Sequence, residues 1–349
     1  MKNYQRLLIT MLLFVVAGQI IFLFQGSLKN EPTPALKIAD IPEFLGNQEI
    51  LVQKEIWSAR MDEAGLDQAY GEFKDTFKDT TFGTQHMMAH VVGQLLYEKS
   101  AIEGLGVCDS TFAFGCYHSF FSQALLGEGL EIIKDLDQAC VAKFGPLGSG
   151  CQHGIGHGVM EYFGPEKLLP ALESCKDTTS TTQLDGCISG VFMEYNVPIL
   201  ITEANASATA RPLENNDPYA PCPSLPEKFR ASCYYEIPQW WQVGPFHDDF
   251  TKHGQLCQGL PNKNHEEDCF LGLGNIIAPS SDFVVEESIN RCAQMPSESG
   301  RVACQAGASW SFDANEPFRN LATLLCDGLN AEASNACEHK AHLLNPENQ

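Results

Sequence analysis

Two pairs of histidines stand four residues apart in this sequence, and a fifth histidine lies between the pairs. The pairs are His86 with His90 and His153 with His157, and the fifth residue is His118. Residues four apart lie on the same face of an α-helix, so each pair would present two imidazoles in one direction. Imidazole nitrogen is a ligand for copper, zinc, iron and nickel. These five side chains are therefore candidate metal ligands, provided that the fold brings their helices together.

The cysteines indicate how such helices would be spaced along the chain. All fourteen fall into close pairs, whose partners stand 8 to 12 positions apart. The interval recurs about every 35 residues, which is typical of helical-repeat proteins. Zinc sites use cysteines about two to four residues apart, closer than any pair here, so we expect local disulfides in an oxidising compartment. The expected bonds are Cys108–Cys116, Cys140–Cys151, Cys175–Cys187, Cys222–Cys233, Cys257–Cys269, Cys292–Cys304 and Cys326–Cys337.

The stretches between cysteine pairs predict helices, and the stretches within the pairs predict loops. From one pair to the next, the cysteines mostly stand 22 to 24 positions apart, enough for two short helices, whereas the residues inside a pair are rich in Gly, Pro, Ser, Thr and Asn. The sequence thus predicts an all-α solenoid of helical hairpins, each stapled by a disulfide. The period resembles that of tetratricopeptide-type repeats over residues 84–345. Their consensus residues are absent, so this resemblance concerns architecture and implies no functional residue.

Alignment of the repeats on the second cysteine places the histidines in two columns, two and six residues after it. Thr84 takes the place of the cysteine in a first, degenerate repeat. Neighbouring helices pack about 8–10 Å apart, so the imidazoles of three repeats could surround one centre. The predicted metal ligands are His86, His90, His118, His153 and His157. We expect copper or zinc first, with iron as a further candidate, and Glu161 as a catalytic base one turn beyond His157.

Packing is the alternative explanation for the histidine columns. If the repeats arose by duplication, equivalent positions share one environment, and the histidines could be inherited core residues. Nearby glycines, such as Gly154 and Gly190, favour close contact between helices. We expect the other five histidines to be solvated, because their neighbours are polar; these are His247, His253, His265, His339 and His342.

The N-terminus predicts a membrane anchor. Lys2 and Arg6 precede 18 mostly apolar residues, 7–24, which are just long enough to span a bilayer with the N-terminus in the cytoplasm. We expect residues 1–26 to form a single-pass signal anchor, 27–50 an extended linker, and 51–345 an extracytoplasmic helical-repeat domain with an insertion at about 198–219. A cleaved signal peptide is the alternative. Either one places the domain in a periplasmic, extracellular or lumenal compartment.

Composition argues against nucleic acid as a partner. The formal net charge of −22 makes the chain repel a phosphate backbone. No H-E-x-x-H motif occurs, so the sequence does not support an ordinary zincin protease, and no G-x-S-x-G motif occurs either.

Two functions remain open from the sequence. The first is a membrane-anchored extracytoplasmic metalloprotein, an oxidoreductase or a hydrolase, with its metal centre on the first three repeats. The second is a non-enzymatic scaffold that binds a protein, peptide or glycan on a concave face. The aromatic residues predicted to contact such a partner are Tyr234, Tyr235, Trp240 and Trp241.

Overall fold

The computed structural model describes residues 47–145, 149–179, 184, 186–201, 206–208, 210–214 and 216–344. The predicted signal anchor, 1–26, lies outside these residues. Among the described helices, none is both long enough and apolar enough to cross a membrane. The predicted linker is wrong at its C-terminal end, because residues 47–50 already form the first turn of helix α2 (Asn47–Ala64).

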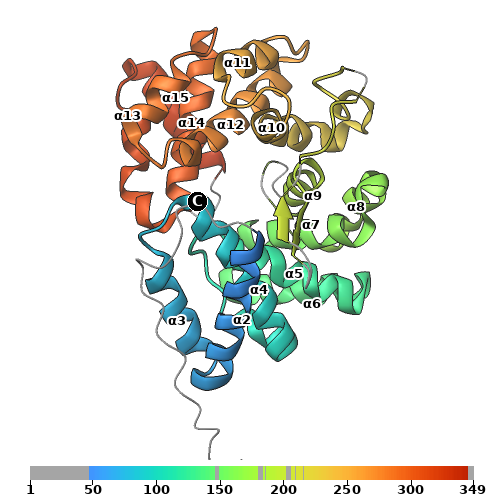
Figure 1. The fold of residues 1–349 in the computed structure, drawn as a ribbon. Coiled ribbons are helices and arrows are strands. Elements are labelled where there is room, and N and C mark those ends of the chain that lie inside the picture. Colours follow the sequence, from blue (N-terminus) through green and yellow to red (C-terminus); the bar gives the residue numbers. More distant parts are fainter. Residues whose placement is uncertain are drawn as a thin grey trace, which may run out of the picture. The chain divides into compact units, whose positions relative to one another are not determined.

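The described part of the chain is helical, and one set of helices forms its centre. We call this set the inner helices; each packs against the next in chain order (Figure 1). The inner helices are α4 (Phe82–Ser100), α5 (Gly115–Glu128), α7 (Ser149–Phe163), α9 (Cys187–Asn196), α10 (Glu227–Val243), α12 (Lys263–Ser280) and α14 (Glu298–Ala314). Between and around them lie α2, α3 (Leu66–Phe77), α6 (Ile133–Phe144), α8 (Leu168–Ser174), α11 (Phe250–Gln258), α13 (Val285–Cys292), α15 (Ala331–Leu344) and the 3₁₀ helix η7 (Glu316–Leu325).

Seven disulfides link neighbouring elements, and all seven predicted pairs are confirmed. Cys140 of α6, for example, is bonded to Cys151 of α7 across 11 residues. Closing a loop of this length stabilises the fold by about 3 kcal/mol in the chain-entropy model. No cysteine is free. So many disulfides indicate an oxidising, extracytoplasmic environment. The structure thus confirms the helical fold and the regular spacing of the disulfides, whereas the solenoid stays a prediction.

The predicted loops within the cysteine pairs are shorter than expected. Helix α12 begins at Lys263, six residues before Cys269, and α14 begins at Glu298, six residues before Cys304. Side-chain caps explain these early starts. The side chain of Asn262 accepts a hydrogen bond from the backbone N–H of Asn264, and the side chain of Ser297 accepts one from the backbone N–H of Gly300.

The insertion is not purely a loop. Strands β1 (Ile199–Ile201) and β2 (Ala206–Ala208) form a small antiparallel pair within residues 198–219. This pair is an exception to the all-α prediction.

Glycines allow the inner helices to touch backbone to backbone. A Cβ atom added to Gly190 on α9 would lie 1.9 Å from the carbonyl oxygen of His153 on α7, and one at Gly156 would lie 2.1 Å from that of Cys187. Gly93, Gly272, Gly274 and Gly307 are equally close to a neighbouring inner helix. No larger residue fits at such distances. The expectation that glycines permit close helix contact is confirmed.

Aromatic contacts join the beginning of this series of helices to its end. Phe82, at the start of α4, packs edge-on against Phe283 with 5.1 Å between ring centroids. Phe283 follows α12 and stacks on Phe318 of η7 at 4.3 Å. The first inner helix therefore lies beside the last ones, so that side chains from both can line one pocket.

Candidate metal centre

Three histidines from helices α4 and α5 converge at one point. His90 Nε2 lies 3.1 Å from His86 Nε2 and 3.1 Å from His118 Nδ1. The three rings meet edge to face, with interplanar angles of 69° to 78°. We call His86, His90 and His118 the first triad; its ligand atoms lie close enough together to hold one metal ion.

The hydrogen bonds of the first triad leave lone pairs facing one another. His86 Nδ1 lies 2.8 Å from the carbonyl oxygen of Phe112. A carbonyl only accepts, so Nδ1 donates and Nε2 of His86 carries a lone pair. His90 Nε2 has at most one proton to share between its two histidine neighbours. A metal ion, by contrast, would satisfy all three nitrogens at once.

The spacing of the first triad also suits a metal. Tetrahedral ligands about 2.0–2.1 Å from zinc lie about 3.3 Å from one another, close to the observed 3.1 Å separations. The outer nitrogens are held as well: Ser119 Oγ lies 3.0 Å from His90 Nδ1. Such partners orient the ring of a metal-binding histidine. The sequence predicts the residues of this triad but not these partners.

His118 also belongs to a second group, with His153 and His157 of α7, which we call the second triad. His153 Nε2 and His157 Nε2 lie 3.1 Å apart, and His157 Nδ1 lies 2.9 Å from Glu194 Oε2. The His118 and His157 rings are stacked, with centroids 4.2 Å apart and an interplanar angle of 20°. Ring lone pairs lie in the ring plane, so stacked rings do not aim at one point. The second triad is therefore less well arranged for a metal than the first.

Burial keeps the imidazoles neutral, which is the form that binds metals. His90, His118 and His157 are 2%, 4% and 2% exposed, and desolvation holds the pKa of each well below the ordinary histidine value. Burial lowers the pKa of His153 to about 4 and also lowers that of half-buried His86. The five predicted ligands thus form one connected cluster of two triads, and all of them except half-buried His86 are buried.

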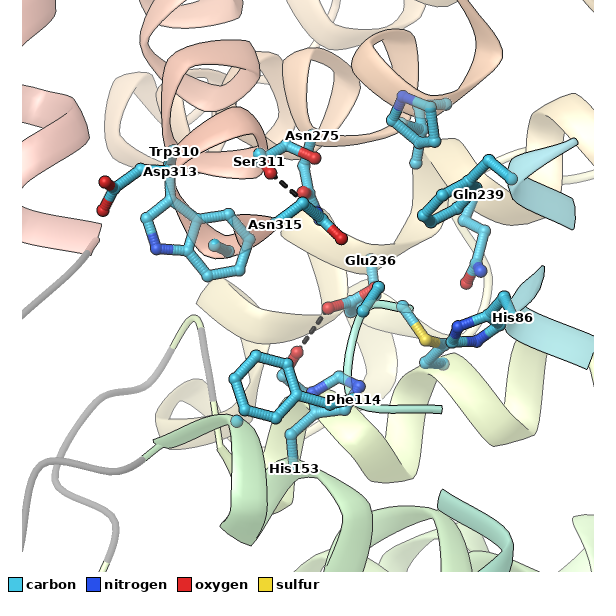
Figure 2. A pocket seen from close by; sticks show the side chains of 18 of the residues that line it. His86, Phe114, His153, Glu236, Gln239, Asn275, Trp310, Ser311, Asp313 and Asn315 are labelled. Carbon is cyan, nitrogen blue, oxygen red and sulfur yellow. Dashed lines mark hydrogen bonds between the residues drawn. The ribbon is translucent and has the colours of Figure 1, made fainter. Parts of the chain in front are cut away.

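A pocket of about 250 Å³ lies against this cluster. In the view of Figure 2, His153 and Phe114 lie below it, and Asn275 and Ser311 lie above. Its lining includes side chains from all seven inner helices, at positions two or six after the second cysteine or after Thr84, which replaces it in the first repeat. These are His86, His118, His153, Ser189, Met193, Tyr235, Gln239, Asn275 and Trp310. Residues from both of the sequence columns that hold the histidines therefore line one cavity.

Glu161, the predicted catalytic base, and Glu236 differ in their position relative to this pocket. Glu161 does not line the pocket; it is half-buried, and its pKa is raised by burial. Glu236 of α10 does line it and accepts a hydrogen bond from Ser189 Oγ (Figure 2). Glu236 stands three residues after Cys233, where four other repeats have glycine. A carboxylate in a glycine column is the signal that sequence reasoning missed.

The four aromatic residues predicted to bind a partner do not form an exposed surface. Tyr234, Tyr235, Trp240 and Trp241 are all at most 5% exposed. Trp240 Nε1 donates to the carbonyl oxygen of Arg211, so its indole holds the chain that follows the inserted strands. Tyr235 lines the pocket, and the other three belong to the core.

Two of the remaining histidines are also buried, contrary to expectation. His253 is 0% exposed and lies against the rings of Trp241 and Phe250, and His265 is 9% exposed beside Tyr234. Polar neighbours in the sequence do not reveal which face of a helix is covered. His247 and His339 are exposed as predicted. For the side chain of His342, the prediction lies outside the described residues.

Comparisons with known proteins do not add a family. The chain matches no family model, and no curated protein or solved structure is significantly similar to it. Its function is therefore argued from the chemistry of the pocket and the two triads.

Acidification is expected to destabilise the metal-free protein. The pKa of His153 is about 4 in the folded chain and about 6.5 in an unfolded one. Because the folded value is lower, the neutral form of His153 contributes to the free energy of unfolding; this contribution is complete above about pH 6.5 and is lost as the pH falls through about 4. At about 1.4 kcal/mol per pKa unit, it amounts to about 3 kcal/mol in total. Urea unfolding of chelator-treated protein at pH 7 and pH 4.5 measures the loss, which should be smaller in His153→Gln. Equal free energies of unfolding at the two pH values would contradict it.

Proposed function

We propose that this protein is an extracytoplasmic, metal-dependent enzyme that binds a transition-metal ion at His86, His90 and His118. The observation that carries the proposal is the convergence of three imidazole nitrogens whose two contacts, His90 with His86 and His90 with His118, cannot both be full hydrogen bonds. Packing alone does not account for a buried nitrogen–nitrogen contact that is left without a proton between its two atoms. Copper and zinc are the first candidates and iron is a further one, since all three accept imidazole ligands.

The pocket supports catalysis over a purely structural role for the metal. Structural zinc sites are closed by four protein ligands, whereas catalytic sites use three and leave one position open. His86 and His118 of the first triad line the pocket, so a small molecule there can reach the ion. A bound transition metal lowers the pKa of coordinated water and polarises a substrate carbonyl. Hydrolysis and oxidation–reduction are the two reaction classes that we propose.

Other pocket residues are placed to bind and orient a substrate. Glu236, with Ser189 hydrogen-bonded to it, is the carboxylate placed to accept a proton. Gln239 and Asn275 offer carboxamide groups, and Trp310 offers a flat apolar face. A cavity of about 250 Å³ is small, so we propose a small-molecule substrate or the end of a larger one.

We further propose that residues 1–26 anchor the enzyme in a membrane and that its helices form a closely packed solenoid. The apolar run 7–24 and its basic flank support the anchor. The seven disulfides and the sequential packing of the inner helices support the solenoid. The scaffold alternative loses its main support, because the four aromatic residues assigned to it are buried.

Metal content tests the proposed function. The full chain, purified from metal-replete medium, should contain about one or more equivalents of a transition metal by elemental analysis. After treatment with a chelator, it should bind Zn²⁺ or Cu²⁺ again on titration. The matched control is His339→Ala, which removes an exposed histidine far along the chain on α15 and should leave the metal content unchanged. Protein that neither carries nor takes up stoichiometric metal would overturn the proposal.

A further inference from the structure

His118 is the residue that a single metal site does not fully explain. It belongs to both triads, and its two ring nitrogens lie on different edges of the ring. Its Nδ1 is directed at His90 in the first triad, 3.1 Å away. Its ring also lies 4.2 Å from that of His157 and 5.5 Å from that of His153, centroid to centroid.

We propose that the centre is dinuclear: a second transition-metal ion binds His153 and His157, and His118 bridges the two ions through its two ring nitrogens. This inference rests on the proposed function of the first triad. Each ion takes one lone pair of the bridging ring, so the ring proton of His118 passes to solvent when the second ion binds. The second ion would have His153 Nε2, His157 Nε2 and His118 Nε2 as its protein ligands.

The contacts of His157 prepare it as a ligand. Its Nδ1 is hydrogen-bonded to Glu194, which leaves Nε2 to face His153 Nε2 at 3.1 Å. A carboxylate behind a histidine is the usual arrangement around metal-binding imidazoles, because it fixes the ring and raises its basicity. Glu194 is itself 5% exposed and accepts a hydrogen bond from the backbone N–H of Ile199 at 2.9 Å. Its carboxylate is therefore held in place behind the second triad.

The distribution of charge also favours a second ion on this side. Two dications close together repel each other, and a buried site must offset that repulsion with negative charge. The bridging His118, once it has lost its proton, supplies one negative charge. The carboxyl groups on this side of the centre are those of Glu194, which is hydrogen-bonded to His157, and of nearby Glu161. The outer partners of His86 and His90 are instead a carbonyl and a hydroxyl, so the carboxylates lie behind the second triad rather than the first.

The stacking of His118 on His157 predicts an order of binding. The first triad already has converging nitrogens, whereas one of the two stacked rings must turn before their lone pairs meet at one ion. Rotation about the ring torsion is soft, so the change is permitted but not free. The first ion should therefore bind more tightly than the second.

Titration of the chelator-treated full chain with Cu²⁺ tests the dinuclear centre. We expect two equivalents per chain by calorimetry, the second at least about tenfold weaker, which corresponds to about 1.4 kcal/mol. In electron paramagnetic resonance, the signal of the first Cu²⁺ should broaden or disappear as the second is added, because the bridging ring couples the two spins. His157→Ala should bind one equivalent and keep an uncoupled signal. His339→Ala should behave as the wild type.

The outcomes separate this inference from the proposed function. One equivalent in both the wild type and His157→Ala would leave the proposed function intact and overturn the dinuclear centre. Two equivalents without spin coupling would overturn the bridging role of His118. No bound Cu²⁺ in the wild type would overturn both. Far-ultraviolet circular dichroism of each variant shows whether the helices persist, and His157→Gln, which keeps the volume of the side chain, replaces the alanine variant if they do not.

Discussion

Replacing His90 by alanine is expected to reduce the affinity of the first triad for a transition metal by more than about 100-fold. His90 Nε2 contacts both other nitrogens of the triad, so its loss leaves two ligands where three converged. Removal of a residue that merely orients a ligand costs about 10- to 100-fold, and removal of a ligand should cost more. Competition between the protein and a chromophoric chelator for Zn²⁺ measures the change.

Ser119→Ala is the matched control for this variant. Ser119 contacts the outer nitrogen of His90 and is not a ligand, so its loss should weaken binding by about 10- to 100-fold and no further. Affinity that survives in His90→Ala would show that the first triad is not the metal site. The free energy of unfolding of both variants must be measured as well, because His90 is buried and its truncation leaves a small cavity.

Gly190→Ala is expected to destabilise the fold by about 3 kcal/mol or more, at or above the upper end for overpacked cores. The added Cβ would lie 1.9 Å from the carbonyl oxygen of His153, and backbone cannot move aside as a side chain can. The helices α7 and α9 must therefore separate. Urea unfolding measures the loss, and Gly71→Ala is the control. Gly71 lies inside α3 with open space around it, so alanine there should stabilise by about 0.5–1 kcal/mol.

The same substitution should affect the two triads differently. The first triad lies on α4 and α5, whereas His153 and His157 lie on the displaced α7. Gly190→Ala should therefore weaken binding at the second triad more than at the first. Wild-type stability in Gly190→Ala would contradict backbone contact between α7 and α9.

The disulfides and the histidine columns could be predicted from the sequence because both depend on local spacing. Paired cysteines such as Cys257 and Cys269 lie 12 residues apart, so they meet across a single turn between helices whatever the remaining fold does. Histidines four apart share a helix face for the same local reason. Repetition of these intervals then predicts which helices are neighbours.

The burial of side chains outside the two histidine columns could not be predicted from local spacing. The stretch that contains Tyr234 and Trp241 has the aromatic composition of a binding surface, yet α10 is packed between α9 and α12 and buries it. His253 has acidic neighbours in the sequence and is nevertheless enclosed by aromatic rings. Whether a helix face is covered depends on elements that lie far away along the chain, and no local pattern records their position.

The sequence by itself determines the pairing of the cysteines, the helical fold and the five histidines that belong together. Only the tertiary structure divides these histidines into two triads that share His118, because ring orientation depends on partners such as Phe112 and Glu194 from other segments. It also shows that Glu236, and not Glu161, lines the pocket. The physical reason is the same in both cases: residue type and spacing decide which chemistry a helix face can present, and packing between distant helices decides what that face meets.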